Sequence, residues 1–384
     1  MFKILIIAGE PSGDHLGADL MKEMVLQHSL NSSTKTQKVH PHVGQTLIQE
    51  KLIFQGIGGS LMKQQGLVSL FRIEDLAVMG LTEVLSSLPR IFSIMRRMVK
   101  YVNVWKPDLI ITIDSPDFST RFVKRVRKVD KFVPTIHYVA PSVWAWRPSR
   151  AKEMAKYYDQ VLALLPFEVD CFRKVGLNCE FVGHPVARQT LPSQNELNKF
   201  VSKMDLDLSK RIISVLPGSR SSEIHYMLPI FIPIIKELAT KFSDLEFVIP
   251  TPIHVSKTIK TKLQRAKVNV KVLSEEDITS EEFMSFKFSL FCLSTMALAT
   301  SGSVSLELAR AGTPMITAYR CGWMFEMVLK RFVKLQSANL INIVLGKIVV
   351  PEFLFEKCNF RELYASIAKL LGDPNLLIEQ KEFE

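Results

Sequence analysis

The sequence predicts an α/β protein made of two Rossmann-like, doubly wound domains that face a cleft. Three observations lead to this prediction. A chain of 384 residues is long for one hydrophobic core and comfortable for two. Strand-like and helix-like segments alternate along it, which is typical of a parallel sheet with helices on both faces. The alternation is interrupted once, by a polar and proline-containing stretch at 183–199, and then restarts.

The first domain is expected over residues 1–186. Apolar, β-branched runs predict its strands at 2–8, 53–57, 109–113, 134–138 and 161–165. The chain opens with "MFKILIIAGEPSGD", whose apolar run is too short for a signal peptide and is followed by acidic residues. We therefore expect a buried strand, a glycine-rich turn and a helix over about 14–28. The polar segment 31–46 is expected to be a surface insertion without regular structure.

The second domain is expected over residues 187–384. Its predicted strands are 211–216, 246–249, 268–273, 288–293 and 315–318, with helices between them. The apolar run that begins at Phe288 is interrupted by Ser and Thr and is too short to span a bilayer. Ligands of such sheets bind outside the carboxyl ends of the strands, so the chemistry is expected in the loops there.

The net charge of +11 is densest in "RFVKRVRKVDKF" at 121–132. This pattern favours an anionic partner such as nucleic acid, a phospholipid surface or a phosphorylated substrate, although a solvated helix face has the same appearance. The stretch 79–105 is apolar at helical spacing, with Arg90, Arg96, Arg97 and Lys100 on the other flank. It suits either the interface of an anionic membrane or packing between layers of the core.

The five cysteines are scattered and contain no C-x-x-C pair. This spacing suits a reducing cytoplasm and argues against a structural zinc site.

Two turns of similar form predict a nucleotide-diphosphate site in the second domain. In "VLPGSRSSEI" (215–224) a strand is followed by Ser219 and Arg220 and then by a helix that is expected to begin near Glu223. Backbone N–H groups at a helix start, beside a guanidinium, form an anion site. The alternative is an ordinary strand–helix turn with a surface arginine.

The second of these turns lies in "TSGSVSLELARAGTPMITAYR" (300–320). Its small residues, Ser301 and Gly302 among them, would let a ligand approach the backbone closely. Glu307, on the following helix, would accept hydrogen bonds from a ribose diol.

A candidate general base lies in the first domain. "IITIDSPDF" places Asp114 at the carboxyl end of a strand, where partial burial suits base chemistry, and we expect Asp117 to cap the next helix. "GEPSGD" adds a second flexible, polar loop at the same sheet edge, with Gly9, Ser12 and Gly13. His137 and His184 are candidate partners for the base, although a single histidine is more often structural.

Two of the four tryptophans, Trp144 and Trp146, lie in "IHYVAPSVWAWRPSR" (136–150). The flanking prolines argue against a regular helix or a central strand here, so we expect a structured loop. Such a loop either binds a ligand or fills a space between domains.

Nine motifs occur together in this order: "AGEPSGD", "DLAVMGLTEVL", "ITIDSPDF", "IHYVAPSVWAWR", "LPFE", "FVGHP", "LPGSRSSEI", "SGSVSLE" and "GTPMITAYR". In this combination, over roughly residues 3–360, the chain resembles the lipid-A-disaccharide synthases, inverting glycosyltransferases of the B-type, two-Rossmann-domain architecture. The resemblance implies transfer of a sugar from UDP-2,3-diacylglucosamine to the 6-hydroxyl of 2,3-diacylglucosamine 1-phosphate (lipid X). The products are the β-1,6-linked lipid A disaccharide 1-phosphate and UDP.

The resemblance also implies where each substrate binds. The first domain would be the acceptor and membrane side, and the second domain would bind the UDP-sugar. The family works without a metal or other cofactor, as a peripheral protein on the anionic cytoplasmic face of the inner membrane. Nucleic acid is not an expected partner, and a homodimer is an assembly that the sequence allows.

The motif match also implies roles for individual residues. Asp114 takes the position of the catalytic base, while Arg220, Glu307 and Asn342 take nucleotide-binding positions. Substrate contacts are also expected from Ser219, Ser301, Gly302, Gly9, Ser12, Gly13, Trp144 and Trp146. Aromatic surface at Trp144 and Trp146 would meet sugar rings or acyl chains, or would brace the segment 79–105.

The sequence departs from the family pattern at three places. The insertion at 31–46 is long, Ile341 stands where the family usually has proline before the asparagine, and the chain reaches "KEFE" without the closing helix that we would expect.

Rival readings are a UDP-N-acetylglucosamine epimerase, a muramyl-peptide glycosyltransferase, a nucleic-acid-binding protein and an inactive membrane scaffold. The segments 79–105 and 141–146 argue against the first two, and the sequence lacks RNP, KH and zinc-finger patterns. The presence of Asp114, Arg220 and Glu307 together argues against the scaffold.

Overall fold

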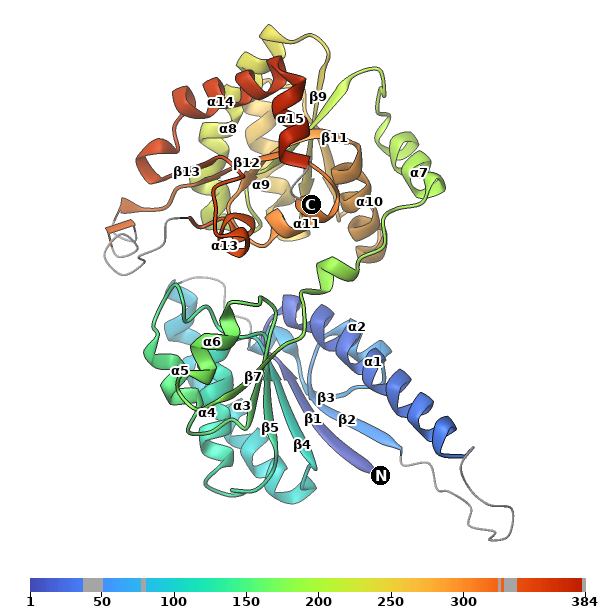
Figure 1. Cartoon of the computed structure of the whole chain (residues 1–384), viewed down its shortest axis with the longest axis vertical. Helices are drawn as coiled ribbons and strands as arrows, with labels where there is room; N and C mark the ends of the chain where they lie inside the picture. The colour runs from blue at the N-terminus through green and yellow to red at the C-terminus, as the bar shows by residue number, and fades with distance from the viewer. Residues whose placement is uncertain (37–50, 77–80, 324–325, 328–336, 382–384) are drawn as a thin grey trace. The chain divides into compact units, whose positions relative to one another are not determined.

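The computed structural model describes residues 1–36, 51–76, 81–323, 326–327 and 337–381. It divides the chain into two compact units, Met1–His184 and Pro185–Glu384, and the division lies in the stretch where the sequence alternation is interrupted. Each unit contains one parallel sheet with helices packed on it (Figure 1).

The sheet of the first unit has the strand order β3-β2-β1-β4-β5-β6-β7, and every neighbouring pair is parallel. The strands are β1 (Phe2–Ala8), β2 (Leu52–Ile57), β3 (Val68–Phe71), β4 (Leu109–Ile113), β5 (Thr135–Tyr138), β6 (Gln160–Ala163) and β7 (Asn178–Phe181). The helices are α1 (Pro11–Thr36), α2 (Ser60–Gln64), η1 (Ile73–Asp75), α3 (Leu81–Trp105), α4 (Pro116–Val126), α5 (Ser149–Met154) and α6 (Glu168–Arg173).

Strand β1 shows why this sheet is covered on both faces. Ile4 and Ile6 pack with residues of α1 and α2, whereas Leu5 and Ile7 pack with residues of α3, α4, α5 and α6. All four side chains are fully buried. Such a continuous apolar strand is expected at the centre of a parallel sheet, because both of its faces are buried. Figure 1 shows α1 and α2 on one side of the sheet and α3, α4 and α5 on the other.

The predicted strands of the first unit are all present, and β1 and β4 have the predicted bounds. The helix expected over 14–28 is longer at both ends, because Pro11 opens it and it continues through residues 31–36 of the expected insertion. Residues 37–46 of that insertion, and 79–80 of the predicted amphipathic segment, lie outside the described residues. Strands β3 and β7 were not predicted, because both are edge strands of four residues with few β-branched side chains.

The sheet of the second unit has the order β10-β9-β8-β11-β12-β13, again with parallel neighbours. Its strands are β8 (Arg211–Leu216), β9 (Leu245–Thr251), β10 (Lys271–Ser274), β11 (Ser294–Thr300), β12 (Met315–Tyr319) and β13 (Glu352–Leu354). The helices are η2 (Pro185–Arg188), α7 (Gln194–Met204), α8 (Ser221–Lys241), α9 (Ile253–Ala266), α10 (Ser280–Leu293), α11 (Val304–Arg310), α13 (Leu340–Leu345), η3 (Phe355–Lys357), α14 (Phe360–Gly372) and α15 (Pro374–Lys381).

The strand predicted at 288–293 is wrong, because these residues form the last turns of α10. Thr279 caps this helix in a capping box with Glu282, so the helix begins at Ser280 and includes the apolar run. Phe288, Leu290 and Phe291 are then buried in the apolar cluster that includes residues of β8 and β11. The strand itself is β11, which has mostly small residues. A short apolar run does not distinguish a buried strand from a buried helix.

Helix α15 packs on α14 near the end of the chain. Gln380 joins α15 to the start of β12, because its Oε1 accepts from Met315 N (2.9 Å) and its Nε2 donates to Met315 O (3.1 Å). None of the helices in the described ranges is both long and apolar enough to cross a bilayer.

Candidate active site

The topology places four loops that contain predicted site residues at the switch points of the two sheets. In a doubly wound sheet, ligands bind outside the carboxyl ends of the two neighbouring strands where the strand order reverses. In the first unit these strands are β1 and β4, and the loops after them contain Gly9 and Asp114. In the second unit they are β8 and β11, which lead into Arg220 and Ser301. Each unit therefore gathers one pair of predicted loops.

Asp114 lies half-buried in a constrained turn after β4. Its backbone N–H donates to Tyr138 O (3.0 Å), and Ser119 Oγ donates to its carbonyl (2.9 Å). Asp114 and Ser115 have φ angles of 53° and 44°, and Val139, after the neighbouring strand β5, has a φ of 77°. The left-handed region is unfavourable for residues with a Cβ, most of all for a β-branched one. Strained backbone of this kind gathers at functional sites, where the surrounding contacts maintain it.

The turns after β1 and β4 touch each other. A Cβ added to Gly9 would lie 2.4 Å from Ser115 Oγ and 2.5 Å from Ser115 Cβ, so a larger residue at position 9 would displace Ser115. The "GEPSGD" segment is not the flexible loop that the sequence suggested: Pro11 opens α1, and Ser12 and Gly13 belong to its first turn. Glycine at position 13 lets this first turn lie close to β1, because an added Cβ would approach Ala8 Cβ to 3.2 Å.

The following aspartate, Asp14, connects two helices. Its buried carboxylate accepts from the backbone N–H groups of Gly59 (2.7 Å), Leu61 (3.1 Å) and Met62 (3.1 Å) at the start of α2. Negative charge is favourable at a helix N-terminus. The carboxylate therefore fixes α2 beside the turn that contains Gly9.

Asp117 does not cap its helix as expected. The N-cap position of α4 is Ser115, Pro116 follows it, and Asp117 is already in the first turn. The Asp117 carboxylate instead accepts two hydrogen bonds from Arg150 Nη2 (both 2.8 Å) and lies 3.9 Å from Arg147 Nη1. This pair joins the turn after β4 to the end of the tryptophan-containing segment.

The tryptophan-containing segment is a loop with turns, as predicted. Trp144 is half-buried, with its ring edge-on to Phe167 and its Nε1–H donating to Glu168 Oε1 (3.2 Å). Trp146 is also half-buried, and the guanidinium of Arg147 lies 5.4 Å from its ring centroid. Trp144 thus braces the start of α6.

Glu168 was not predicted as a site residue, although it belongs to the quoted "LPFE" motif. It is only 4% exposed, and its Oε2 accepts from Leu165 N (3.1 Å). Burial raises the pKa of this carboxyl from 4.5 to about 7, in opposition to the hydrogen bonds from Leu165, Trp144 and Leu164, which lower it. A buried carboxyl close to the loop of Trp144 therefore changes charge near neutral pH.

His137 is a structural residue in this fold. Its side chain is fully buried, and Nδ1 lies 2.8 Å from Thr112 Oγ1. Burial, with the charge of Arg150, lowers its pKa to about 3, so the ring is neutral at physiological pH. His184 lies half-buried at the end of the first unit.

Arg220 occupies the N-cap position of α8 with its side chain 74% exposed. Glu223, in the first turn, already accepts from Ser219 N (2.8 Å), Arg220 N (3.2 Å) and Arg220 Nη1 (3.2 Å). The N–H groups and the guanidinium that the sequence predicts as anion donors are therefore gathered at this turn, where they bind the Glu223 carboxylate. His254 Nε2 donates to Ser219 O (2.7 Å) and supports the same turn.

The turn after β11 contains Ser301 and Gly302. Ser301 N donates to Ala318 O (2.9 Å), and Ser301 Oγ donates to Glu352 Oε1 (3.0 Å). No heavy atom lies within 4 Å of a Cβ added to Gly302, so the chain leaves open space there. Glu307 is the fourth residue of α11. Its Oε2 forms an ion pair with Lys287 Nζ (2.6 Å), and both side chains are largely buried.

Asn342 is only 2% exposed, and its amide is fully used inside the second unit. Oδ1 accepts from the N–H groups of Val349 and Val350 (2.9 Å each), and Nδ2 donates to Val350 O (2.9 Å) and Ser337 Oγ (3.3 Å). Its nucleotide-binding role stays a prediction. Neither Glu352 nor Lys287 was singled out from the sequence, because isolated charged residues carry no local pattern.

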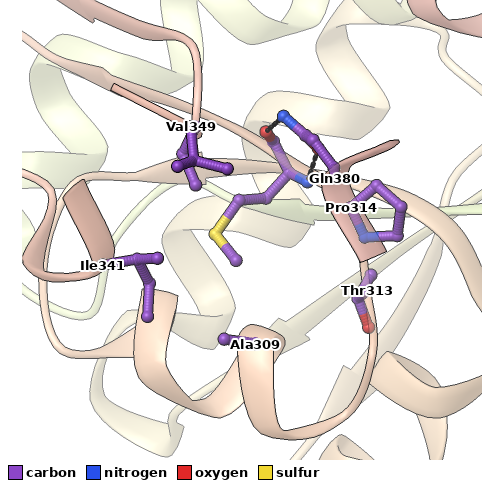
Figure 2. Close-up of a pocket in the computed structure, with 8 residues that line it drawn as sticks. Ala309, Thr313, Pro314, Ile341, Val349 and Gln380 are labelled. Atoms are coloured by element: carbon purple, nitrogen blue, oxygen red, sulfur yellow. Dashed lines mark hydrogen bonds between the residues drawn. The ribbon is translucent and has the colours of Figure 1, made fainter. Parts of the chain in front are cut away.

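The second unit also has a small pocket away from these turns (Figure 2). It lies beside Thr313, Pro314 and Met315, which lead into the amino end of β12, whereas the site residues follow the carboxyl ends. Gln380 is one of the residues that line this pocket, and its side-chain amide makes two hydrogen bonds to the backbone of Met315. Within the described part of the chain, no three His, Cys, Asp or Glu side chains are grouped as in a metal site.

Comparison with known proteins gives full-length matches. The family model for lipid-A-disaccharide synthetase matches residues 4–382. The lipid-A-disaccharide synthase of Rhodospirillum centenum is 39% identical over 378 residues, which cover 98% of this chain and 87% of the relative. That of Rhodopseudomonas palustris strain BisB18 is 38% identical over 377 residues, covering 97% and 87%.

Solved structures share the fold at low sequence identity. The UDP-GlcNAc 2-epimerase from Neisseria meningitidis bound to UDP-GlcNAc has a TM-score of 0.64 and 13% identity, covering 99% of this chain and 94% of that one. The S. aureus MnaA–UDP co-structure has a TM-score of 0.61 and 13% identity, covering 100% and 92%. These matches confirm the two-sheet, B-type glycosyltransferase-like fold that the sequence predicts.

Proposed function

The chain belongs to the lipid-A-disaccharide synthase family, and we propose that Asp114 is the base with which it condenses UDP-diacylglucosamine with lipid X. The family match over residues 4–382 is the observation that carries the activity. In the proposed step, Asp114 takes the proton of the lipid X 6-hydroxyl while that oxygen attacks the anomeric carbon of the donor. The bond from this carbon to the diphosphate oxygen breaks, and UDP leaves with the electron pair.

The position of Asp114 supports this role. A general base must lie within hydrogen-bond reach of the proton that it takes, and a residue at a switch point lies where a substrate is expected. The left-handed backbone at Asp114 and Ser115 turns the chain sharply directly after β4. Contact with Gly9 fixes that turn from the side of β1. Acceptor contacts from Gly9, Ser12 and Gly13 belong to the same proposal.

The leaving UDP is assigned to the turns of the second unit. Arg220 would exchange its bond to Glu223 for the diphosphate, which carries more charge and matches the guanidinium fork. Open space at Gly302 lets the phosphates approach the backbone near Ser219 and Ser301. Glu307 would accept from the ribose hydroxyls while Lys287 fixes its carboxylate. Of these groups, the Arg220 guanidinium and the backbone N–H groups of the turns would neutralise the charge that develops on the leaving group.

Trp144 and Trp146 are assigned to the acceptor or its acyl chains. Both rings are half-buried, so each combines fixed packing with an accessible surface. The edge-on contact with Phe167 and the hydrogen bond to Glu168 keep the Trp144 ring in one orientation. A flat apolar surface held in this way suits a sugar ring or an acyl chain.

Membrane association, at the anionic cytoplasmic face of the inner membrane, is assigned to the outer surface of α3 and α4. Phe92, Arg96, Lys100 and Val104 are exposed and four residues apart, so they form one stripe along α3. The opposite face of this helix contributes Ile94, Met95, Met98 and Val102 to the core. The amphipathic pattern therefore serves core packing and leaves a mixed apolar and cationic surface.

Helix α4 extends this surface. The guanidinium of Arg125 lies 5.8 Å from the centre of the Phe92 ring, so the two helices adjoin there. Arg121 and Lys124 are exposed on α4, and Phe132, which follows it, is 91% exposed. Cations beside exposed aromatic side chains are typical of surfaces that bind anionic lipid.

A transfer assay tests the activity. The protein is incubated in detergent with radiolabelled UDP-2,3-diacylglucosamine, lipid X and a chelator, and the products are separated by chromatography. We expect disaccharide 1-phosphate and UDP in equal amounts. A parallel incubation with UDP-N-acetylglucosamine alone tests the epimerase reading; conversion to the 2-epimer, without disaccharide from the acylated pair, would overturn the assignment.

A further inference from the structure

The carboxylate of Glu352 gathers hydrogen bonds from two segments that are distant in sequence. Ser301 Oγ donates to Oε1 (3.0 Å), and Ser337 Oγ donates to Oε2 (2.8 Å). The backbone N–H of Ala338 lies 3.2 Å from Oε1 and 3.0 Å from Oε2. Glu352 is half-buried at the first position of β13. A partly buried carboxylate is stabilised by hydrogen-bond donors of this kind. In turn, the Glu352 carboxylate holds each of these donor groups in position.

The hydrogen bond to Glu352 determines whether Ser301 can donate to a bound phosphate. A serine has one hydroxyl hydrogen and one backbone N–H. The hydroxyl hydrogen goes to Glu352, and the N–H goes to Ala318 O (2.9 Å). Ser301 therefore has no polar hydrogen left for a phosphate oxygen. Its part in binding a diphosphate must be indirect, through the backbone that follows it.

The residues after Ser301 are placed to make that contact. Gly302 is half-buried with open space beside it, and Ser303 is exposed at the N-cap position of α11. The orientation of this turn depends on Ser301, which Ala318 holds from β12 and Glu352 holds from β13. A ligand that enters the open space meets a turn whose conformation is already fixed.

Asn342 belongs to the same chain of contacts. Its Nδ2 donates to Ser337 Oγ (3.3 Å), which also accepts from Asn339 N (3.1 Å) and gives its own hydrogen to Glu352. Asn342 thereby orients the hydroxyl of Ser337 toward the carboxylate. The path Asn342–Ser337–Glu352–Ser301 connects a buried amide to the turn after β11. Through this path Asn342 would support the turn after β11 without a direct contact to the nucleotide.

We propose that Glu352 is a positioning residue that holds the turn 301–303 in the conformation that receives the diphosphate of the UDP-sugar. The inference rests on the proposed function, because it assigns that diphosphate to the second unit. Glu352 itself is negatively charged and hydrogen-bonded to Ser301, Ser337 and Ala338, so it acts through them and not on the phosphates.

The test compares Glu352→Gln with Ser301→Ala and the double variant. An amide in place of the carboxylate keeps the shape but turns one acceptor oxygen into a donor that faces other donors. We expect the KM for the UDP-sugar and the Kd for UDP, measured by calorimetry, to rise about tenfold. The KM for lipid X should change less than twofold. A purely structural defect would lower the folded fraction without this split between substrates.

The double-variant comparison tests the route of the effect. If Glu352 acts through Ser301, the two substitutions together should weaken UDP binding no more than Glu352→Gln alone. Ser301→Ala keeps the fold testable if Glu352→Gln does not fold, because it removes only a hydroxyl, and its own Kd for UDP should rise in the same direction. The exposed Glu379 on α15 supplies the control, and Glu379→Gln should bind UDP like the wild type.

Two results would overturn the inference alone: unchanged UDP affinity in folded Glu352→Gln and Ser301→Ala, or strictly additive losses in the double variant. A wild-type protein that binds no UDP would overturn the proposed function and this inference with it. The wild-type titration therefore distinguishes the two failures.

Discussion

The indole N–H of Trp144 donates a hydrogen bond to the buried carboxyl of Glu168 across 3.2 Å. This contact joins the loop after β5 to the start of α6, while the bond from Arg150, at the start of α5 directly after the loop, to Asp117 joins that end of the loop to the first turn of α4. The loop is thus fixed on both sides beside Asp114. Its aromatic residues have a defined orientation because of contacts that lie outside the loop.

The pH dependence of stability should reveal the titration of Glu168. Its folded pKa of about 7 exceeds the ordinary value of 4.5, so the folded state binds the proton more tightly than the unfolded state. This contribution is complete below pH 4.5 and is lost as the pH rises through 7. We expect Glu168→Gln to remove this pH-dependent contribution. Between pH 5 and 8, the free energy of unfolding should then decrease less in the variant than in the wild type, by up to roughly 3 kcal/mol.

Urea denaturation at several pH values measures this difference. His137 acts in the opposite direction, because its pKa is lowered to about 3 and stability is lost as the pH falls below 6.5. It contributes equally to the wild type and the variant and cancels in their difference. The exposed Glu153→Gln is the matched control and should keep the wild-type slope. A Glu168→Gln profile parallel to the wild type would show that the carboxyl does not titrate near 7.

Replacement of Asp114 by Asn should lower kcat by about 10²- to 10⁴-fold and leave the Kd for UDP within a factor of two. General-base catalysis contributes 10²–10⁴-fold, and asparagine tolerates the left-handed backbone at this position, so the fold is kept. Single-turnover transfer with prebound donor measures the chemical step. Asp117→Asn, in the first turn of α4, is the control and should lose less than tenfold, because the Asp117 side chain is 67% exposed. Normal turnover in Asp114→Asn would remove it as the base.

Replacement of Arg220 by Ala should raise the Kd for UDP by about 10- to 100-fold, and Arg220→Lys should lie between. The guanidinium offers a bidentate contact to phosphate that a lysine cannot reproduce. Isothermal titration with UDP and with uridine separates the phosphate contribution, because uridine affinity should not change. Lys210→Ala, at an exposed cation in the same unit, should bind UDP normally. Equal affinities of Arg220→Ala and wild type for UDP would exclude the assigned contact.

Reversal of charge on α3 should impair membrane binding without impairing chemistry. Each cation near an anionic surface contributes about 1 kcal/mol, so Arg96→Glu with Lys100→Glu should reduce binding to phosphatidylglycerol vesicles at least tenfold. Co-sedimentation measures binding, and transfer in detergent should stay within twofold. Lys203→Glu with Lys210→Glu, two exposed sites in the second unit, is the matched control. Equal loss in both double variants would mean that only net charge matters.

Much of the fold follows from local patterns in the sequence. The continuous apolar run of β1, the turn chemistry of "LPGSR" and the order of the motifs identify two parallel α/β sheets and the loops at their carboxyl ends. These features depend on residues that are neighbours in the chain. The same local patterns misplaced one strand, because the apolar residues before Ser294 suit a buried helix as well as a strand.

Contacts between distant residues were decided only by the tertiary structure. The sequence places Asp117 in front of a helix, but the fold brings it to Arg150, and it brings Glu352 to Ser301 and Asn342 to Ser337. A carboxylate or an amide accepts almost any nearby donor, so its partner is chosen by the packing of strands and helices around it. The sequence therefore determined the family, the fold class and the loops of the site, whereas packing determined which polar groups hold those loops in position.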